Sequence, residues 1–154
     1  MNTQQKEKIL NLLEVDRING SYINNYWFSY NDFLDPTDNF TDFSCECLDG
    51  KREYIALIEN LLGKDETAKI FVQVYGFEDV QERFVCADTL IIFSKLPLIE
   101  IEEIFYEPID IFPSDIGEMT DFTCHTFLIG DTGELIPITE LLNGESSVYY
   151  CWWD

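Results

Sequence analysis

The chain has 154 residues, of which 46% are hydrophobic and 15% aromatic, and its formal net charge is −21 at pH 7. A chain of this length buries about two thirds of its unfolded surface, and this aromatic content excludes a disordered acidic tail. A charge of this sign and size repels nucleic acids and anionic membranes and attracts cationic proteins.

The N-terminal third is predicted to form two helices with an acidic segment between them. Residues 4–14 have the apolar spacing of a helix. The second helix carries an i, i+3, i+4 stripe that starts at Tyr54, and we expect Asp49 to cap it and Gly63 to end it. Between the two helices we expect loop, with a short strand at residues 26–30.

The remainder of the chain has mainly β character. Strands are expected at residues 68–75, 84–93, 122–129, 135–138 and 148–153. The segment after Pro97 alternates like a strand, but the stripe of Leu98, Ile101 and Ile104 favours a helix. A short helical piece is expected at residues 139–142. The sequence thus predicts a single α+β domain over residues 1–154, with a mostly antiparallel sheet and two or three packed helices.

The negative charge is concentrated in two segments that contain no lysine or arginine. Residues 18–50 contain six acids and residues 96–154 contain thirteen. The first segment includes an acidic-aromatic stretch at residues 25–49, NYWFSYNDFLDPTDNFTDFSCECLD. Nothing within this stretch neutralises its carboxylates. Whether the two segments meet on one face of the fold decides whether they can form one binding surface.

Patterns for cysteine chemistry and zinc are weak. A cysteine nucleophile needs a nearby histidine, but the lone His125 directly follows Cys124, and neighbours on a strand point to opposite faces. Cys45 and Cys47 have one residue between them, whereas zinc knuckles have two to four. We therefore expect reduced structural thiols, no metal site and no cofactor.

The segment DPTDNFTD does not match a calcium loop either. Counted from Asp35, the sixth position holds Phe40 in place of the glycine of an EF-hand, although Glu46 falls at the twelfth. With thirty acids in the chain, carboxylate pairs arise by chance and do not indicate a glycosidase. Phosphate-binding glycine loops, serine elbows and basic patches are absent from the sequence. We expect no catalytic residues and a protein that is not an enzyme.

Two interpretations of the acidic and aromatic residues stay open, a solvated face and a protein interface. In an interface, exposed rings are the anchors and carboxylates match the lysines and arginines of a basic partner. Trp152 and Trp153 point to opposite sides of a strand, so one of them can be exposed. The residues assigned to the partner-binding surface are Trp27, Tyr30, Asp32, Asp35, Asp38, Asp42, Glu46, Asp115, Glu118, Asp121, Trp152 and Asp154.

A small, strongly acidic domain without a catalytic pattern resembles, in general type, the immunity proteins of bacterial polymorphic-toxin and contact-dependent inhibition systems. The resemblance implies a protein that binds a cognate basic toxin, such as a nuclease, and occludes its active site. The alternative is a nucleic-acid-mimicking inhibitor of anti-restriction or anti-nuclease type, although a DNA mimic needs long ordered rows of carboxylates. A small enzyme with an unrecognised site is the least favoured class.

The sequence predicts a cytoplasmic location. No apolar run approaches the roughly 18 residues that a membrane span requires. The polar start MNTQQKEKIL lacks the apolar core of a secretory signal. We therefore expect no membrane partner.

Overall fold

The computed structural model describes residues 1–21, 23–43, 50–77, 84–107, 111–121, 125–142, 144 and 146–154. The helices are α1 (Thr3–Asn19), α2 (Tyr30–Phe33), α3 (Lys51–Lys64), α4 (Leu98–Tyr106) and the short 3-10 helix η1 (Ile138–Glu140). The strands are β1 (Asn25–Ser29), β2 (Thr41–Phe43), β3 (Lys69–Phe77), β4 (Val85–Ser94), β5 (Asp115–Glu118), β6 (Thr126–Ile129), β7 (Leu135–Pro137) and β8 (Ser147–Trp152).

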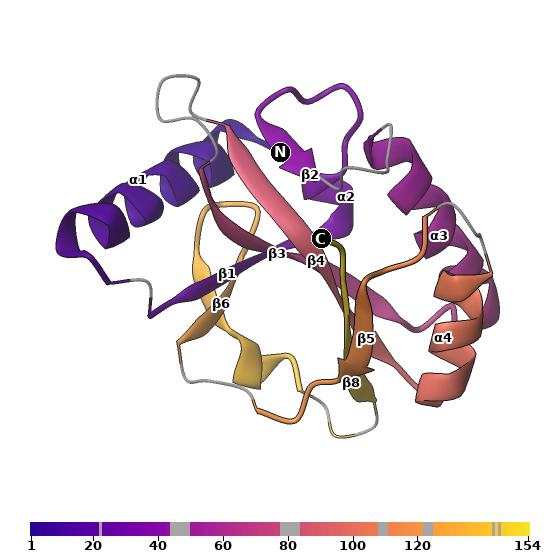
Figure 1. Ribbon diagram of the computed structural model, residues 1–154. Helices are drawn as coiled ribbons and strands as arrows, with labels where there is room; N and C mark the ends of the chain where they lie inside the picture. Colours follow the sequence, from indigo (N-terminus) through magenta and orange to yellow (C-terminus); the bar gives the residue numbers. More distant parts are fainter. Residues whose placement is uncertain are drawn as a thin grey trace.

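The strands form one mostly antiparallel sheet in the order β5-β8-β4-β3-β1-β6-β7, with β2 paired to β4 (Figure 1). Two of the pairings, β1 with β6 and β2 with β4, are parallel. The predicted α+β class with a mostly antiparallel sheet is confirmed. Among the described helices, none is both long and apolar enough to cross a membrane.

The two faces of the sheet are covered unequally. All four α-helices contribute to the larger core cluster, so they cover one face. A smaller cluster around Trp27, Phe71 and Phe93 lies on the opposite face beneath η1. In β1, Tyr26 and Phe28 belong to the first cluster and Trp27 to the second, which is the alternation that a strand imposes.

Two predicted helix ends differ from the structure. Helix α1 extends five residues past the predicted residue 14, to Asn19, where Gly20 takes a left-handed conformation with φ of 60°. Helix α3 continues through Gly63 to Lys64. Asp65 ends α3 because it leaves the helical conformation, with φ of −135°, and its carboxylate accepts hydrogen bonds from Thr67, Ser94 and Lys95. The expected cap Asp49 lies outside the described residues.

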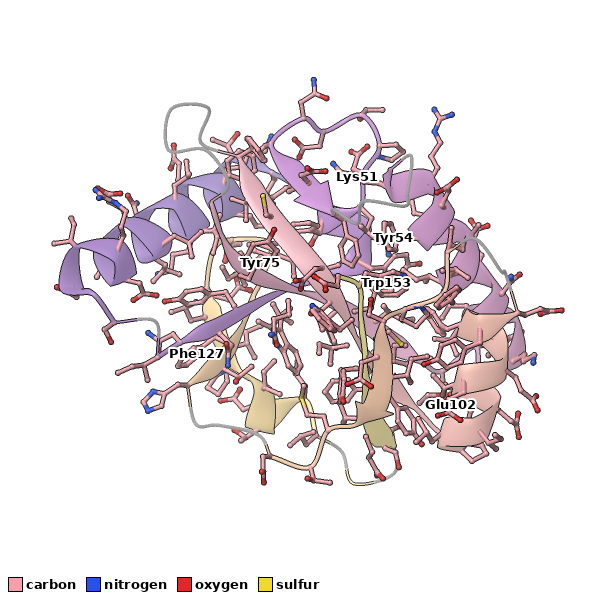
Figure 2. The ribbon with its side chains drawn as sticks, viewed as in Figure 1. Lys51, Tyr54, Tyr75, Glu102, Phe127 and Trp153 are labelled. Carbon is pink, nitrogen blue, oxygen red and sulfur yellow. The ribbon has the colours of Figure 1, made fainter. Side chains whose placement is uncertain are left out.

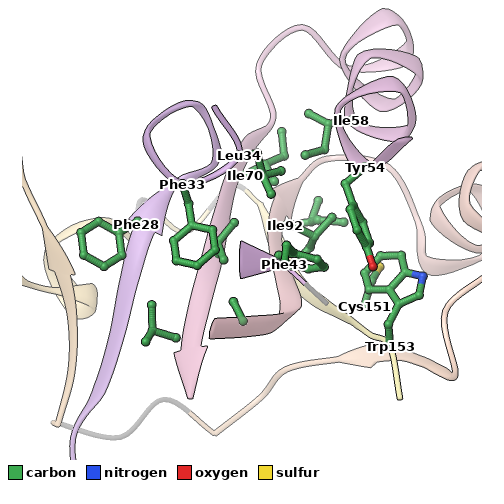
Figure 3. Packing of buried hydrophobic residues seen from close by; sticks show 14 of the residues in the cluster. Phe28, Phe33, Leu34, Phe43, Tyr54, Ile58, Ile70, Ile92, Cys151 and Trp153 are labelled. Carbon is green, nitrogen blue, oxygen red and sulfur yellow. The ribbon is translucent and has the colours of Figure 1, made fainter. Parts of the chain in front are cut away.

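Both base-free segments reach the same edge of β4. Strand β3 pairs with one edge, so β2 at Val85–Ala87 and β8 at residues 89–94 share the other. Between them, the Trp153 amide donates to the carbonyl of Asp88 at 3.0 Å. Where the segments meet, Trp153 contacts Phe43 and Tyr54 edge to face, with ring centroids 5.9 and 5.1 Å away (Figure 3). The two segments therefore meet through buried rings.

Candidate protein-binding surfaces

Most rings of the acidic-aromatic stretch belong to the core. Tyr26, Phe28, Phe33 and Phe43 are at most 2% exposed. Trp27 is 1% exposed, and its Nε1 donates to Gln73 Oε1 at 3.1 Å. Trp27 was expected on the partner surface, but its indole is part of the core beneath η1 and offers no exposed face. The ring of Tyr30 stays half-buried at the start of α2.

The carboxylates of the stretch surround a lysine from outside it, in what we call the lysine-centred loop (residues 35–42 with Lys51). Lys51 Nζ donates to the main-chain oxygens of Asp35 and Asp38, at 3.0 and 2.5 Å, and to Thr41 Oγ1 at 2.7 Å. These contacts use all three donors of an ammonium group. Lys51 lies in the first turn of α3, so the helix brings the cation to the loop (Figure 2). A cation from outside the stretch therefore lies among the carboxylates of Asp35, Asp38 and Asp42.

Asp38 is the most heavily contacted carboxylate of this loop. Its Oδ1 accepts from Lys6 Nζ at 3.1 Å and from the Phe40 amide at 2.9 Å, and its Oδ2 accepts from the Met1 amine at 2.9 Å. Lys6 also lies over the Phe40 ring, 5.3 Å from its centroid. Nearby, Gln5 Nε2 donates to Asp32 Oδ2 at 3.0 Å. Helix α1 thus supplies donors to two of the predicted partner-binding acids.

The titration behaviour of the loop follows from these contacts. Burial opposes ionisation of Asp38, but hydrogen bonds from Phe40, the Met1 amine and Lys6 outweigh it and lower the pKa of Asp38. Hydrogen bonds from the Thr37 hydroxyl and amide lower the pKa of Asp35. Burial lowers the pKa of Lys51, while the surrounding carboxylates act in the opposite direction.

Asp42 faces a broad hollow on the outer side of this loop. The hollow measures about 770 Å³, and Lys51, Arg52 and Phe84 also line it. Two bases therefore share the lining of this hollow with Asp42. The charge of the loop is locally mixed rather than uniformly negative.

A second acidic region has the opposite character, and we call it the α4–β5 surface (Glu102, Tyr106, Phe112, Asp115 and Tyr150). Tyr106 and Phe112 are 43% and 53% exposed, and their ring centroids lie 6.3 Å apart. Tyr150 donates its hydroxyl hydrogen to Asp115 Oδ2 at 2.8 Å. Figure 2 places Glu102 on α4, well away from Lys51 at the start of α3. Tyr106, Phe112 and Asp115 are exposed, whereas Glu102 and Tyr150 are half-buried.

Within the described residues, no ion pair involves α4 or β5. Helix α1 has Arg17 and helix α3 has Lys64 in the last turn, where a cation is favoured by the helix dipole. Helix α4 has no base in its last turn, which instead contains Glu103. A hollow of about 490 Å³ beside Glu103 and Tyr106 is also lined by Lys64. Carboxylates therefore lie at the C-terminal end of α4, where the helix dipole is negative and disfavours them.

The nearby carboxylates also raise the pKa values of the tyrosines of the α4–β5 surface. Burial raises the pKa of Tyr106, and the charges of Glu102 and Asp115 raise it further. The hydrogen bond to Asp115 is the main reason why the pKa of Tyr150 is raised, and burial and the Asp115 charge add to it. The ring of Tyr150 covers Gly117, where an added Cβ would meet the hydroxyl oxygen at 2.7 Å.

The other predicted C-terminal residues lie around this surface. Asp115 pairs with Trp152 across β5 and β8, and Glu118 pairs with Tyr149. Trp152 is half-buried and its Nε1 donates to Asp88 Oδ2 at 3.1 Å.

Two further predicted residues are exposed. The amide of Asp154 donates to Ser114 Oγ at 3.0 Å. Asp121 follows β5 and is also exposed. Glu46 lies outside the described residues. The predicted residues therefore form two groups, one around the lysine-centred loop and one around β5.

Sequence reasoning missed Glu102, Tyr106 and Phe112. A signal was available, because the predicted helix after Pro97 ends in acids and lacks a C-terminal base, unlike the other two long helices. It also missed Lys51, since the cation comes from outside the base-free stretch. Only the fold places it against the loop.

The cysteines and possible metal ligands give no second candidate. Among the described residues, no cluster of three histidine, cysteine or acidic side chains is placed to hold a metal ion. Cys86 and Cys151 are buried, and burial raises the pKa of the Cys151 thiol. Cys45, Cys47 and Cys124 lie outside the described residues.

Comparisons of the chain with protein-family models, with curated proteins and with solved structures found no significant match.

Proposed function

We propose that this chain is a non-catalytic, acidic protein-binding domain that acts as a bacterial immunity protein in the cytoplasm. In this proposal it binds a cognate basic toxin of nuclease type and occludes the toxin's active site. The α4–β5 surface is the principal contact, and Trp152 at the end of β8 and Asp154 beyond it extend this surface.

The observation that carries the proposal is the combination of exposed rings with carboxylates that have no cationic partner within the described residues. Isolated exposed apolar residues are normal, but Tyr106 and Phe112 form a pair beside Glu102 and Asp115. Aromatic anchors bury a large area at low entropic cost. Carboxylates around them speed the encounter with a cationic protein and exclude anionic ones.

The end of α4 supports the same proposal through its energetics. Acids near a helix C-terminus oppose the helix dipole at a cost of a few tenths of a kcal/mol each. Residues that lower stability and make no compensating contact within the fold are expected at functional sites. Lysines and arginines of a basic partner offset the unfavourable charge at the end of α4.

Capture from the native host tests the proposal. The wild-type chain should retain one basic protein, encoded next to it, while the triple variant Glu102→Gln/Glu103→Gln/Asp115→Asn should retain much less. The matched control Glu7→Gln/Glu66→Gln/Glu140→Gln removes the same charge from exposed positions elsewhere. It should bind like the wild type.

Kinetics with the captured partner sharpen the result. The α4–β5 variant should associate about tenfold more slowly at low salt and show a flatter salt dependence. Equal behaviour of this variant and the control would contradict the proposal. Inhibition of several unrelated DNA-binding enzymes would instead indicate a nucleic-acid mimic.

A further inference from the structure

A small groove lies between α2 and α3, on the outer side of the lysine-centred loop. It measures about 290 Å³ and is lined by Tyr30, Leu34, Asp35, Pro36, Ile55 and Glu59, among others. This is just below the range of about 300–1,000 Å³ that is usual for small-molecule pockets. Its size therefore suits a single inserted side chain.

The walls and rim of the groove differ in character. Leu34 is 1% exposed, and Figure 3 shows it beside Ile58 beneath α3. Ile55 and Tyr30 are half-buried and pack against the core. Asp35 and Glu59 add two carboxylates, one from each side. The groove thus combines an apolar and aromatic interior with a doubly negative rim.

Both carboxylates can accept further hydrogen bonds. Thr37 donates its amide and hydroxyl hydrogens to Oδ1 of Asp35, at 2.8 and 2.7 Å, which leaves Oδ2 without a donor from the described residues. Lys51 binds the main-chain oxygen of Asp35 rather than its carboxylate. Glu59 is exposed on α3 and makes no hydrogen bond or ion pair with a described residue.

We propose that the α2–α3 groove binds one arginine side chain of the basic partner. The three methylenes of arginine pack against Ile55 and Pro36, and the guanidinium lies beside the Tyr30 ring. Its planar fork of five donors reaches carboxylates on two sides, which the compact ammonium of lysine cannot do. The inference rests on the proposed function for its partner but uses a site apart from the α4–β5 surface.

The probe for this test is N-acetyl-arginine amide, titrated into the isotope-labelled chain and followed by NMR. We expect saturable shifts of the amides of Leu34, Ile55 and Glu59, with a dissociation constant on the order of millimolar, as befits one side chain. N-acetyl-lysine amide should bind several-fold more weakly. N-acetyl-citrulline amide has the same shape without the charge, and it should leave these amides unshifted.

Two exposed variants complete the test. Glu59→Gln should weaken arginine binding about threefold to fivefold, the range expected for one exposed ion pair. Glu66→Gln makes the same charge change beyond the end of α3 and should leave binding unchanged. Equal shifts with arginine and citrulline, or equal binding by wild type and Glu59→Gln, would overturn the inference.

The outcome is distinguishable from failure of the proposed function. If the chain captures its basic partner through α4–β5 but its groove does not respond to arginine, only the groove inference fails. If the groove binds arginine while no basic protein is captured, the proposed function fails and the groove is still an arginine site.

Discussion

The lysine-centred loop and the α4–β5 surface both come from base-free segments, yet their carboxylates have different roles. In the loop, Lys6 of α1 forms an ion pair with Asp38, and Lys51 of α3 donates to the main-chain oxygens of Asp35 and Asp38. At α4–β5, no described base forms an ion pair, and the acids accept hydrogen bonds only from a tyrosine hydroxyl. A segment without bases is therefore not necessarily a free anionic surface.

The difference follows from the neighbours in space rather than from composition. The loop packs between α1 and α3, which together contain six of the nine bases of the chain. Strand β5 is at the end of the sheet, next to β8 and α4, and these elements contain none. We therefore expect the loop to serve mainly stability and, under the proposed function, the α4–β5 surface to serve binding.

The largest expected effect comes from removing the central cation of the loop. Lys51→Met leaves the carbonyl oxygens of Asp35 and Asp38 without their donor and removes a charge beside Asp42. A hydrogen bond to a charged group contributes about 1.5–3 kcal/mol, and Lys51 is half-buried. We therefore expect the variant to lower the free energy of unfolding, measured with urea, by about 2 kcal/mol.

Lys64→Met on the same helix is the matched control for this variant. It makes the same substitution at an exposed position and should change the unfolding free energy by less than about 0.5 kcal/mol. Similar small losses in both variants would remove the structural role of the loop cation.

Asp38→Asn should cost about 1 kcal/mol at neutral pH, since it weakens the contacts to Lys6 and the Phe40 amide. The pKa of Asp38 is lower in the folded chain than the value of about 3.9 in an unfolded chain. Its contribution is thus complete above about pH 4 and is lost as the pH falls through the folded pKa. Unfolding free energies of both chains measured between neutral and acid pH should converge at low pH. A constant difference would contradict this account.

Gly117→Ala tests the α4–β5 geometry with a smaller effect. The new Cβ would meet the Tyr150 hydroxyl at 2.7 Å, so the flexible end of that side chain must move away from Asp115. We expect the free energy of unfolding to fall by about 0.5 kcal/mol. The ultraviolet titration of tyrosinate should also show a fall in the Tyr150 pKa, because the hydrogen bond to Asp115 is what chiefly raises it.

Gly63→Ala serves as the control for this substitution, because nothing lies within 4 Å of an added Cβ there. Because Gly63 lies inside α3, the alanine variant should raise the free energy of unfolding by about 0.5–1 kcal/mol. It should leave the tyrosine titration unchanged. If Gly117→Ala also left that titration unchanged, the contact between Tyr150 and Asp115 would be excluded.

The sequence predicted the helices and strands better than it predicted how the charged residues are arranged. The apolar stripes of α3 and α4 and the β-branched runs of β3 and β4 follow from local spacing, and the structure confirms them. Strands β2 and β5 were missed because three or four residues carry little periodicity, and their pairing partners are distant in the chain.

The candidate site was harder to predict than the fold. The sequence analysis assigned Asp115 and Trp152 to the partner-binding surface, but their pairing across two strands was visible only in the structure. It also assigned Trp27 to the surface, although the alternation in β1 directs this ring to the second core cluster. Burial on both faces of a central strand cannot be recognised from a short run of rings.

The most direct test of the account compares the sign of two stability changes at low ionic strength, where surface charges are screened least. Asp38→Asn should destabilise the chain. Glu102→Gln/Glu103→Gln should stabilise it by about 0.5–1 kcal/mol, because the change relieves repulsion and removes acids from the negative end of α4. Urea unfolding of the two variants should therefore give opposite signs. Destabilisation by both would show that the α4 acids also serve the fold, and would contradict the distinction between the two regions.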